Sequence, residues 1–189
     1  MKAATLITIL CTVLLFSCRK TEPPAASGDN ASPASLQEAD LLRSPDYRGL
    51  IQEYRMMLAE DPKNMAALVA LGNAYFDNGQ WRAAVSMYEH ALALDPRNAD
   101  VHTDRGTALR NLGLADQAIE EYRRAIELEP GHLDARYNLG VVFAYDKKDR
   151  RAALHIWDEL LKMAPNYRNA RLIHEHIASL QQRPQKAAP

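Results

Sequence analysis

The residues best suited to acid–base catalysis or metal binding are the histidines, and their spacing keeps them apart. His174 and His176 are the closest pair, and at two positions along a helix they point about 200° apart, so they cannot hold one ion together. The sequence also lacks an HExxH pattern, a glycine-rich phosphate loop and a Gly-x-Ser-x-Gly turn. We therefore predict that the chain is not an enzyme and takes no metal or cofactor. The six histidines are His90, His102, His132, His155, His174 and His176.

The two cysteines indicate lipid attachment rather than redox chemistry. Residues 3–16 form an apolar stretch of 14 residues after Lys2. This is shorter than the roughly 20 residues that a membrane-spanning helix needs, and it is typical of a secretory signal peptide. The run LFSC that ends at Cys18 resembles the lipobox of bacterial lipoproteins. Because Cys11 lies inside the predicted leader, the mature chain keeps no cysteine for a disulfide.

The lipobox resemblance implies that residues 1–17 are a lipoprotein signal peptide and that Cys18 carries the lipid anchor. Several acyl chains on one residue hold a protein stably at a membrane, here on the periplasmic side of the cell envelope. Arg19 follows the cysteine, not the aspartate associated with inner-membrane retention in enteric bacteria, which favours the outer membrane. The alternative is an uncleaved anchor, but Arg19 and Lys20 outnumber Lys2 and oppose export of the chain beyond them.

Residues 18–45 are expected to form the lipid anchor and a flexible linker. Residues 19–35 are rich in Pro, Ala, Ser and Gly and show no apolar periodicity, which is a linker composition with a reach on the order of 20–25 Å. Two alternatives stay open for the next residues: a short helix that begins with a capping box of Ser35 and Glu38, or coil. The tail at 183–189 is expected to be disordered.

The charge balance removes the simplest argument for nucleic-acid binding. Lys and Arg number 23 against 24 Asp and Glu, for a net charge of -1, so there is no basic excess to meet phosphates. Hydrophobic residues at 47% and charged residues at 25% are average for a soluble globular domain. We therefore expect no nucleic-acid partner.

Landmark residues recur along the chain at a fixed period. Pro62, Pro96 and Pro130 are 34 residues apart, and Pro165 follows after 35. Self-similarity at such a period is the signature of a repeat protein. The same steps separate Gly72, Gly106 and Gly140; Ala84, Ala118 and Ala153; Tyr88, Tyr122 and Trp157; and Ala91, Ala125 and Leu160.

A 34-residue unit that reads Leu-Gly-x-x-Tyr, then Ala, an aromatic residue, Ala and Pro is similar to the tetratricopeptide repeat (TPR). The resemblance implies an all-α fold: an α-solenoid of antiparallel helix pairs, a TPR superhelix, with capping helices. We expect about eight helices between residues 47 and 182 and no strands. The predicted units are an N-terminal capping helix or partial repeat at 46–64, repeats at 65–98, 99–132 and 133–167, and a C-terminal capping helix at 168–182.

The residue types at the landmarks fit the packing of paired helices. Gly72 and Ala84 are small where the two helices of a unit cross, and Tyr75 and Tyr88 fill the wider gaps beside them. The prolines stop each unit's last helix.

The turns between helices carry their own signals. Asn64 and Asn98 follow the prolines and are predicted to be helix N-caps. The extra residue of the third repeat is expected in the Tyr145–Arg151 stretch, where it only lengthens the turn between the paired helices.

In the TPR family, the first helices of the units line a concave groove that commonly binds a peptide or a segment of a partner. By this resemblance the function is protein binding, and aromatic residues and arginine are the types that dominate binding energy. The alternative is that each aromatic side chain packs against its neighbouring helix. The predicted groove residues are Asn73, Asp77, Thr107, Asn111 and Val141, with Phe76, Arg110, Tyr137 and Tyr145 as hot spots.

One well-known use of the fold, a clamp on a chaperone's C-terminal carboxylates, does not fit this sequence. That clamp needs lysines, asparagines and an arginine in the groove, whereas Asp104 and Asp134 stand at two of the required positions. We expect a terminal carboxylate to be repelled.

Arg105 stands where the first repeat has the apolar Leu71. A polar residue at a core position indicates a functional exception. The alternative is structural: the stem covers apolar surface while the charged head pairs with an acidic neighbour such as Asp104 or Asp134.

These expectations combine into one function. The chain is predicted to be a membrane-tethered TPR scaffold or adaptor lipoprotein that binds a segment of another cell-envelope protein in its groove and helps to assemble an envelope complex, such as a pilus secretin or the barrel-assembly machinery. Two alternatives stay open. One is a structural lipoprotein that self-associates into homo-oligomers, and the other is an accessory subunit of a peptidoglycan-active enzyme.

Overall fold

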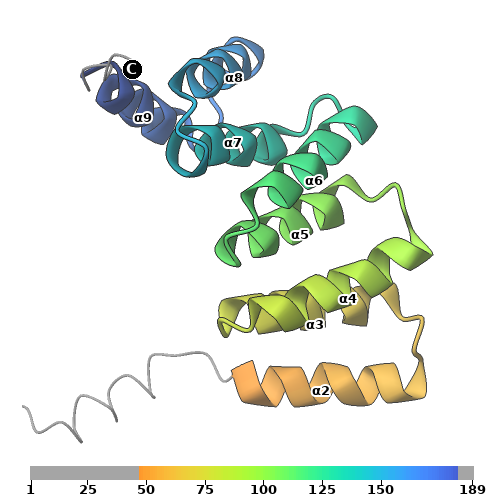
Figure 1. Ribbon diagram of the computed structural model, residues 1–189. Coiled ribbons are helices and arrows are strands. Elements are labelled where there is room, and N and C mark those ends of the chain that lie inside the picture. Colours follow the sequence, from red (N-terminus) through yellow and green to blue (C-terminus); the bar gives the residue numbers. More distant parts are fainter. Residues whose placement is uncertain (1–46, 183–189) are drawn as a thin grey trace, which may run out of the picture. The chain divides into compact units, whose positions relative to one another are not determined.

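The computed structural model describes residues 47–182 as a stack of helices (Figure 1). The predicted signal peptide, Cys18, the linker, the possible helix at 35–42 and the tail at 183–189 lie outside the described residues. Within 47–182 all regular structure is helical, which confirms the predicted all-α solenoid with about eight helices. The elements are α2 (Tyr47–Glu60), α3 (Met65–Asp77), α4 (Trp81–Leu94), α5 (Ala99–Asn111), α6 (Ala115–Leu128), α7 (Leu133–Val141), the π-helical η1 (Val142–Asp146), α8 (Arg150–Met163) and α9 (Ala170–Gln182).

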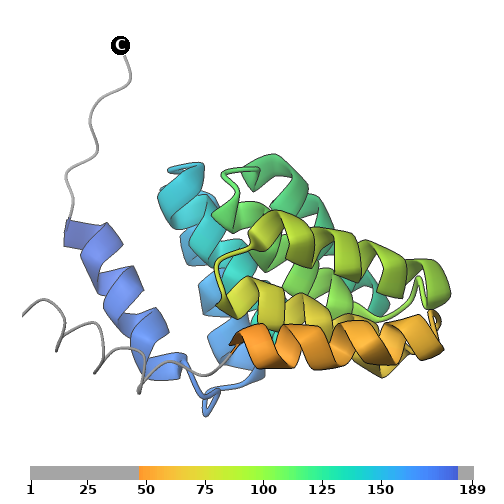
Figure 2. The ribbon, with the colours of Figure 1, turned by 90° about the horizontal axis from the view of Figure 1, so that it is seen from below.

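The helices form three successive pairs flanked by single helices. The pairs are α3 with α4, α5 with α6, and α7–η1 with α8, and each helix packs on the next along the chain. The first helices of neighbouring pairs also contact each other, α3 with α5 and α5 with α7, so they form one continuous surface. Figure 2, a view from below, shows α9 standing out from the three pairs. Among the helices of residues 47–182, none is long and apolar enough to cross a membrane.

Side-chain caps begin the helices where the sequence predicts them. Asn64 and Asn98 each accept a hydrogen bond on Oδ1 from the backbone N–H three residues later, both at 3.0 Å, which confirms the two predicted N-caps and satisfies an otherwise unpaired donor. The third repeat uses an imidazole that the sequence analysis did not assign. His132 Nδ1 accepts a hydrogen bond from the backbone N–H of Ala135 at 3.1 Å.

Within each pair, a ring on the second helix fills the space that a glycine leaves on the first. A Cβ atom added at Gly72 would lie 2.5 Å from Cε1 of Tyr88, and one added at Gly106 would lie 2.8 Å from Cε1 of Tyr122. Gly140 faces Trp157 in the same way. The first helix therefore needs the predicted glycine at the crossing. The aromatic ring, however, lies directly on the glycine, whereas the prediction placed it in a gap beside the crossing. Tyr88, Tyr122 and Trp157 are at most 1% exposed.

The third repeat accommodates its extra residue inside the first helix, which corrects the expectation of a longer turn alone. In the second repeat the N–H of Leu112 donates to Ala108, four residues back, whereas in the third the N–H of Lys147 donates to Val142, five residues back. The added residue thus widens the last turn into a π-helix. After it, Lys148 has φ 57°, a left-handed conformation that the first two repeats assign to glycine.

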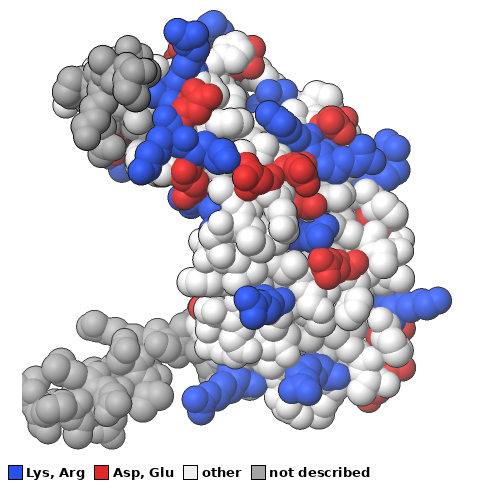
Figure 3. Space-filling model, viewed as in Figure 1, with Lys and Arg blue, Asp and Glu red and all other residues white. Residues whose placement is uncertain are grey.

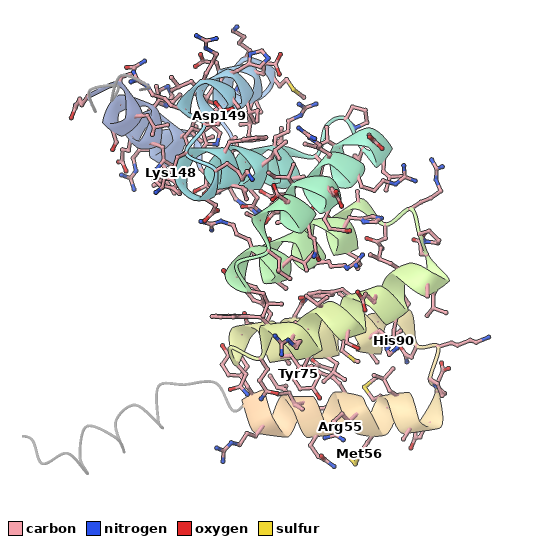
Figure 4. All side chains as sticks on the ribbon, in the orientation of Figure 1. Arg55, Met56, Tyr75, His90, Lys148 and Asp149 are labelled. Atoms are coloured by element: carbon pink, nitrogen blue, oxygen red, sulfur yellow. The ribbon has the colours of Figure 1, made fainter. Side chains whose placement is uncertain are left out.

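The two terminal helices are buried to different depths. In α9, Ile173 and Leu180 are 0% and 5% exposed and pack with Trp157, so α9 covers the last repeat, as expected of a cap. Helix α2 has no fully buried residue, although Leu58 packs against the core of the first repeat. Figure 4 shows Met56 on the side of α2 that is turned away from α3, and this side chain is 56% exposed.

We expect Gly72→Ala to lower the free energy of unfolding by about 1–3 kcal/mol, because the new methyl group overlaps the Tyr88 ring. The matched control is Gly131→Ala, where an added Cβ meets nothing within 4 Å, with an expected change within about 0.5 kcal/mol. Urea unfolding followed by circular dichroism measures both. Equal stabilities for the two variants would show that the ring contact does not limit the packing of the pair.

Candidate binding groove

A cavity of about 280 Å³ opens on the surface formed by the first helices of repeats one and two. Its walls come from α3 and α5, with one ring from α4 at its base. Four of the nine predicted groove residues line it: Asn73, Phe76, Asp77 and Thr107. Two further lining residues are Tyr88, which the sequence analysis assigned to the core, and Asp104, which it noted only as a departure from the carboxylate clamp.

The buried tyrosines of the second helices hydrogen-bond to two polar side chains of the groove. The Tyr88 hydroxyl donates to Asn73 Oδ1 at 2.7 Å, and the Tyr122 hydroxyl donates to Thr107 Oγ1 at 3.1 Å. Burial raises the pKa of Tyr88 above its usual range and the pKa of Tyr122 to about 12, so both phenols keep their protons at neutral pH. Each hydroxyl thus holds one polar groove side chain in place.

The cavity is acidic and holds uncompensated charge. Asp104 is half-buried, and its pKa is raised to about 6. Burial is the main cause of this value; the carboxylates of Asp100 and Asp134 also raise the pKa, and His132 lowers it. Within residues 47–182, neither Asp104 nor the exposed Asp77 forms a hydrogen bond or an ion pair. Such a site favours a positively charged neighbour.

Arg105 does not neutralise this cavity, because it pairs on another side of the stack. Its Nη2 donates to Glu89 Oε1 at 2.9 Å and its Nη1 to Glu121 Oε1 at 3.1 Å. The expected partners Asp104 and Asp134 are therefore wrong. Glu121 also accepts from His102 Nδ1 at 2.7 Å, so this network ties α4, α5 and α6 together and is structural.

The predicted aromatic hot spots of the third repeat lie against the C-terminal cap. The Tyr145 hydroxyl and His176 Nδ1 form a hydrogen bond of 2.5 Å, and the Tyr137 ring lies 6.4 Å from the His176 ring. Burial lowers the pKa of His176, and its ring stacks on Trp157 at 5.1 Å. Tyr137 and Tyr145 thus contact the C-terminal cap, while Tyr145 stays 36% exposed, and their role as hot spots stays a prediction.

The remaining predicted groove residues also lie outside the cavity. Arg110 Nε donates to Asp146 Oδ2 at 2.5 Å, so its charge is already paired. Val141 packs in the cluster around Trp157, and Asn111 is exposed at the end of α5. The cavity described above therefore gathers predicted groove residues from the first two repeats.

Charged side chains are unevenly distributed over the face shown in Figure 3. They gather over α6–α9, whereas α2–α4 show a mostly uncharged surface. Among residues 47–182, no group of three His, Cys, Asp or Glu side chains is placed to hold a metal ion.

The tetratricopeptide repeat family model matches residues 69–131 and 103–149. Among solved structures, MamA has a TM-score of 0.65 at 23% identity, over 79% of this chain and 82% of MamA. The TPR2B domain of yeast Sti1, solved in complex with pHsp70, has a TM-score of 0.56 at 27% identity, over 59% of this chain and 92% of that domain. The first TPR domain of Spaghetti (RPAP3), bound to the HSP90 peptide SRMEEVD, has a TM-score of 0.57 at 22% identity, over 65% of this chain and 94% of that domain.

No curated protein matches the chain. The family model and the solved structures agree on the fold, which is a TPR-like helical solenoid.

We expect Asp104→Asn to raise the free energy of unfolding at pH 7 by about 1–3 kcal/mol. The pKa of this carboxyl is about 6 in the folded chain against 3.8 normally, so its ionised form disfavours folding above pH 6. As the pH falls through 6 the carboxyl is protonated in the folded chain, and the advantage of asparagine shrinks and disappears below about pH 4.

Urea unfolding of both proteins across this pH range measures the effect. The matched control is Asp158→Asn on the exposed face of α8, expected to stay within about 0.5 kcal/mol throughout. An Asp104→Asn protein that is less stable than the wild type at pH 7 would contradict the assignment of an uncompensated carboxylate.

Proposed function

We propose that this chain of tetratricopeptide repeats is a scaffold or adaptor lipoprotein of the cell envelope. Lipid on Cys18 tethers it to a membrane, the outer one in preference to the inner, and the groove binds a segment of another envelope protein. The observation that carries the binding role is the cavity between α3 and α5, lined by four of the residues that the sequence predicts to face a partner. The complexes of yeast Sti1 and Spaghetti with peptides support it by likeness of fold.

The groove combines the features that make a useful binding surface. Phe76 offers a half-buried ring, and polar groups surround it at fixed positions because Tyr88 and Tyr122 hold Asn73 and Thr107. Pre-ordered side chains lose little entropy when a partner binds. A segment of an assembling envelope complex, such as a pilus secretin or the barrel-assembly machinery, is the proposed occupant.

Self-association is the second candidate, and helix α2 favours it. This helix has no fully buried residue. Its Leu50, Met56 and Met57 are 38%, 56% and 38% exposed. Leu50 and Met57 are seven residues apart and share one helical face, and contiguous exposed apolar surface marks contact sites. A second copy of the chain could cover them.

Photo-crosslinking in palmitate-labelled cells tests the tether and the groove together. With a benzophenone amino acid in place of Phe76, we expect irradiation to join the palmitate-labelled chain to a different envelope protein. The control position is Met163, which is 50% exposed on the second helix of the third repeat and is expected to give no such adduct. The Cys18→Ala chain is expected to remain an unlabelled precursor.

Each arm of this experiment can contradict one part of the proposal. Palmitate in Cys18→Ala would refute the lipid anchor. Identical adducts from positions 76 and 163 would refute the groove as the binding surface. An adduct of two copies of the chain would favour self-association, and an adduct with a peptidoglycan hydrolase would favour the accessory-subunit alternative.

A further inference from the structure

We propose that the cavity between α3 and α5 receives a lysine or arginine side chain from the bound segment, with Asp77 and Asp104 as its counter-charges. This inference rests on the proposed function, since it specifies the chemistry of the segment that the groove binds. It makes the groove selective for a basic segment with apolar neighbours, and unsuited to a chain that ends in acidic residues and a carboxylate.

The charge of the cavity favours a cationic side chain. Two aspartates line the cavity and no lysine or arginine does. The nearest cations on α5 are engaged elsewhere: Arg105 pairs with Glu89 and Glu121, and Arg110 pairs with Asp146. The negative charge of the cavity is therefore left for a partner to neutralise, and charge complementarity of this kind sets partner choice.

The burial of Asp104 also favours a cationic partner. Asp104 is half-buried without a hydrogen-bond or ion-pair partner among residues 47–182, and an unpaired carboxylate out of bulk water costs folding free energy. Asp134 shows the contrast on the next repeat, because it accepts hydrogen bonds from Tyr167 and Arg168 within the chain. The unpaired carboxylate of Asp104 lowers the free energy of unfolding, and a cation bound beside it removes this penalty.

The size and lining of the cavity suit one long basic side chain. A volume of about 280 Å³ lies just below the range of pockets that hold whole small ligands, and it suits one long side chain of a larger partner. Phe76 lines the same cavity and gives the aliphatic stem of a lysine or arginine an apolar surface. An aromatic face also attracts the cation itself.

The inferred partner differs from that of a solved neighbour with the same fold. The peptide bound to the TPR domain of Spaghetti (RPAP3) reads SRMEEVD and ends in acidic residues. Here Asp77 and Asp104 would meet such an end with like charge, which disfavours binding.

Selection of random peptides on the full chain, held in detergent through its C-terminus, tests this inference. We expect the recovered peptides to share a lysine or arginine beside apolar residues. In a synthetic copy, replacing that residue by uncharged norleucine should weaken binding to the wild type about tenfold or more. The Asp77→Asn/Asp104→Asn chain should bind the original peptide about as weakly, and should no longer distinguish the two peptides.

The control chain carries Asp158→Asn and should bind like the wild type. Recovered peptides without a basic residue, or an Asp77→Asn/Asp104→Asn chain that still prefers lysine over norleucine, would overturn this inference and leave groove binding intact. If no peptide is enriched over the bare support, the proposed function fails and the inference fails with it. Circular dichroism of each variant confirms that the helices are formed.

Discussion

The structure depends on one repeated contact, the ring on a second helix that lies directly on a glycine of the first. Two antiparallel helices cannot pack this closely if both carry large side chains where they cross. In the first repeat the Tyr88 ring lies on Gly72, and in the second the Tyr122 ring lies on Gly106, so one helix has no side chain at the crossing. The same tyrosines extend through the pair and donate hydrogen bonds to Asn73 and Thr107. The contact that makes each layer therefore also positions the side chains that a partner meets.

The cavity contrasts with the neighbouring network around Arg105 in how its charges are satisfied. Arg105 pairs with Glu89 of the first repeat and with Glu121 of its own repeat, so a charge at a core position becomes a link between layers. Asp104, the residue next to it, is left without such a partner among the described residues. Unfavourable local features are expected where a protein carries out its function. The unpaired carboxylate of Asp104 is such a feature, and it lines the cavity.

Much of the fold follows from the sequence because a period of 34 residues fixes contacts inside each repeat. The N-caps at Asn64 and Asn98 are local in the same way and were predictable. Contacts between repeats were not, because they depend on how one layer is rotated on the next. The ion pair of Arg105 with Glu89 and the packing of Tyr145 on His176 of the terminal helix are examples. The π-helix that follows α7 was not predictable either, because the sequence shows that a residue is inserted but not which turn of the chain accommodates it.

The central claim is that the buried ring of the first repeat orients the groove, and replacing Tyr88 by phenylalanine tests it most directly. This change keeps the ring on Gly72 and removes only the hydroxyl that holds Asn73, at an expected cost of about 1 kcal/mol in folding. The measurement is the affinity of both proteins for one groove-binding peptide. The account predicts several-fold weaker binding by the folded Tyr88→Phe chain, and an unchanged affinity would contradict it.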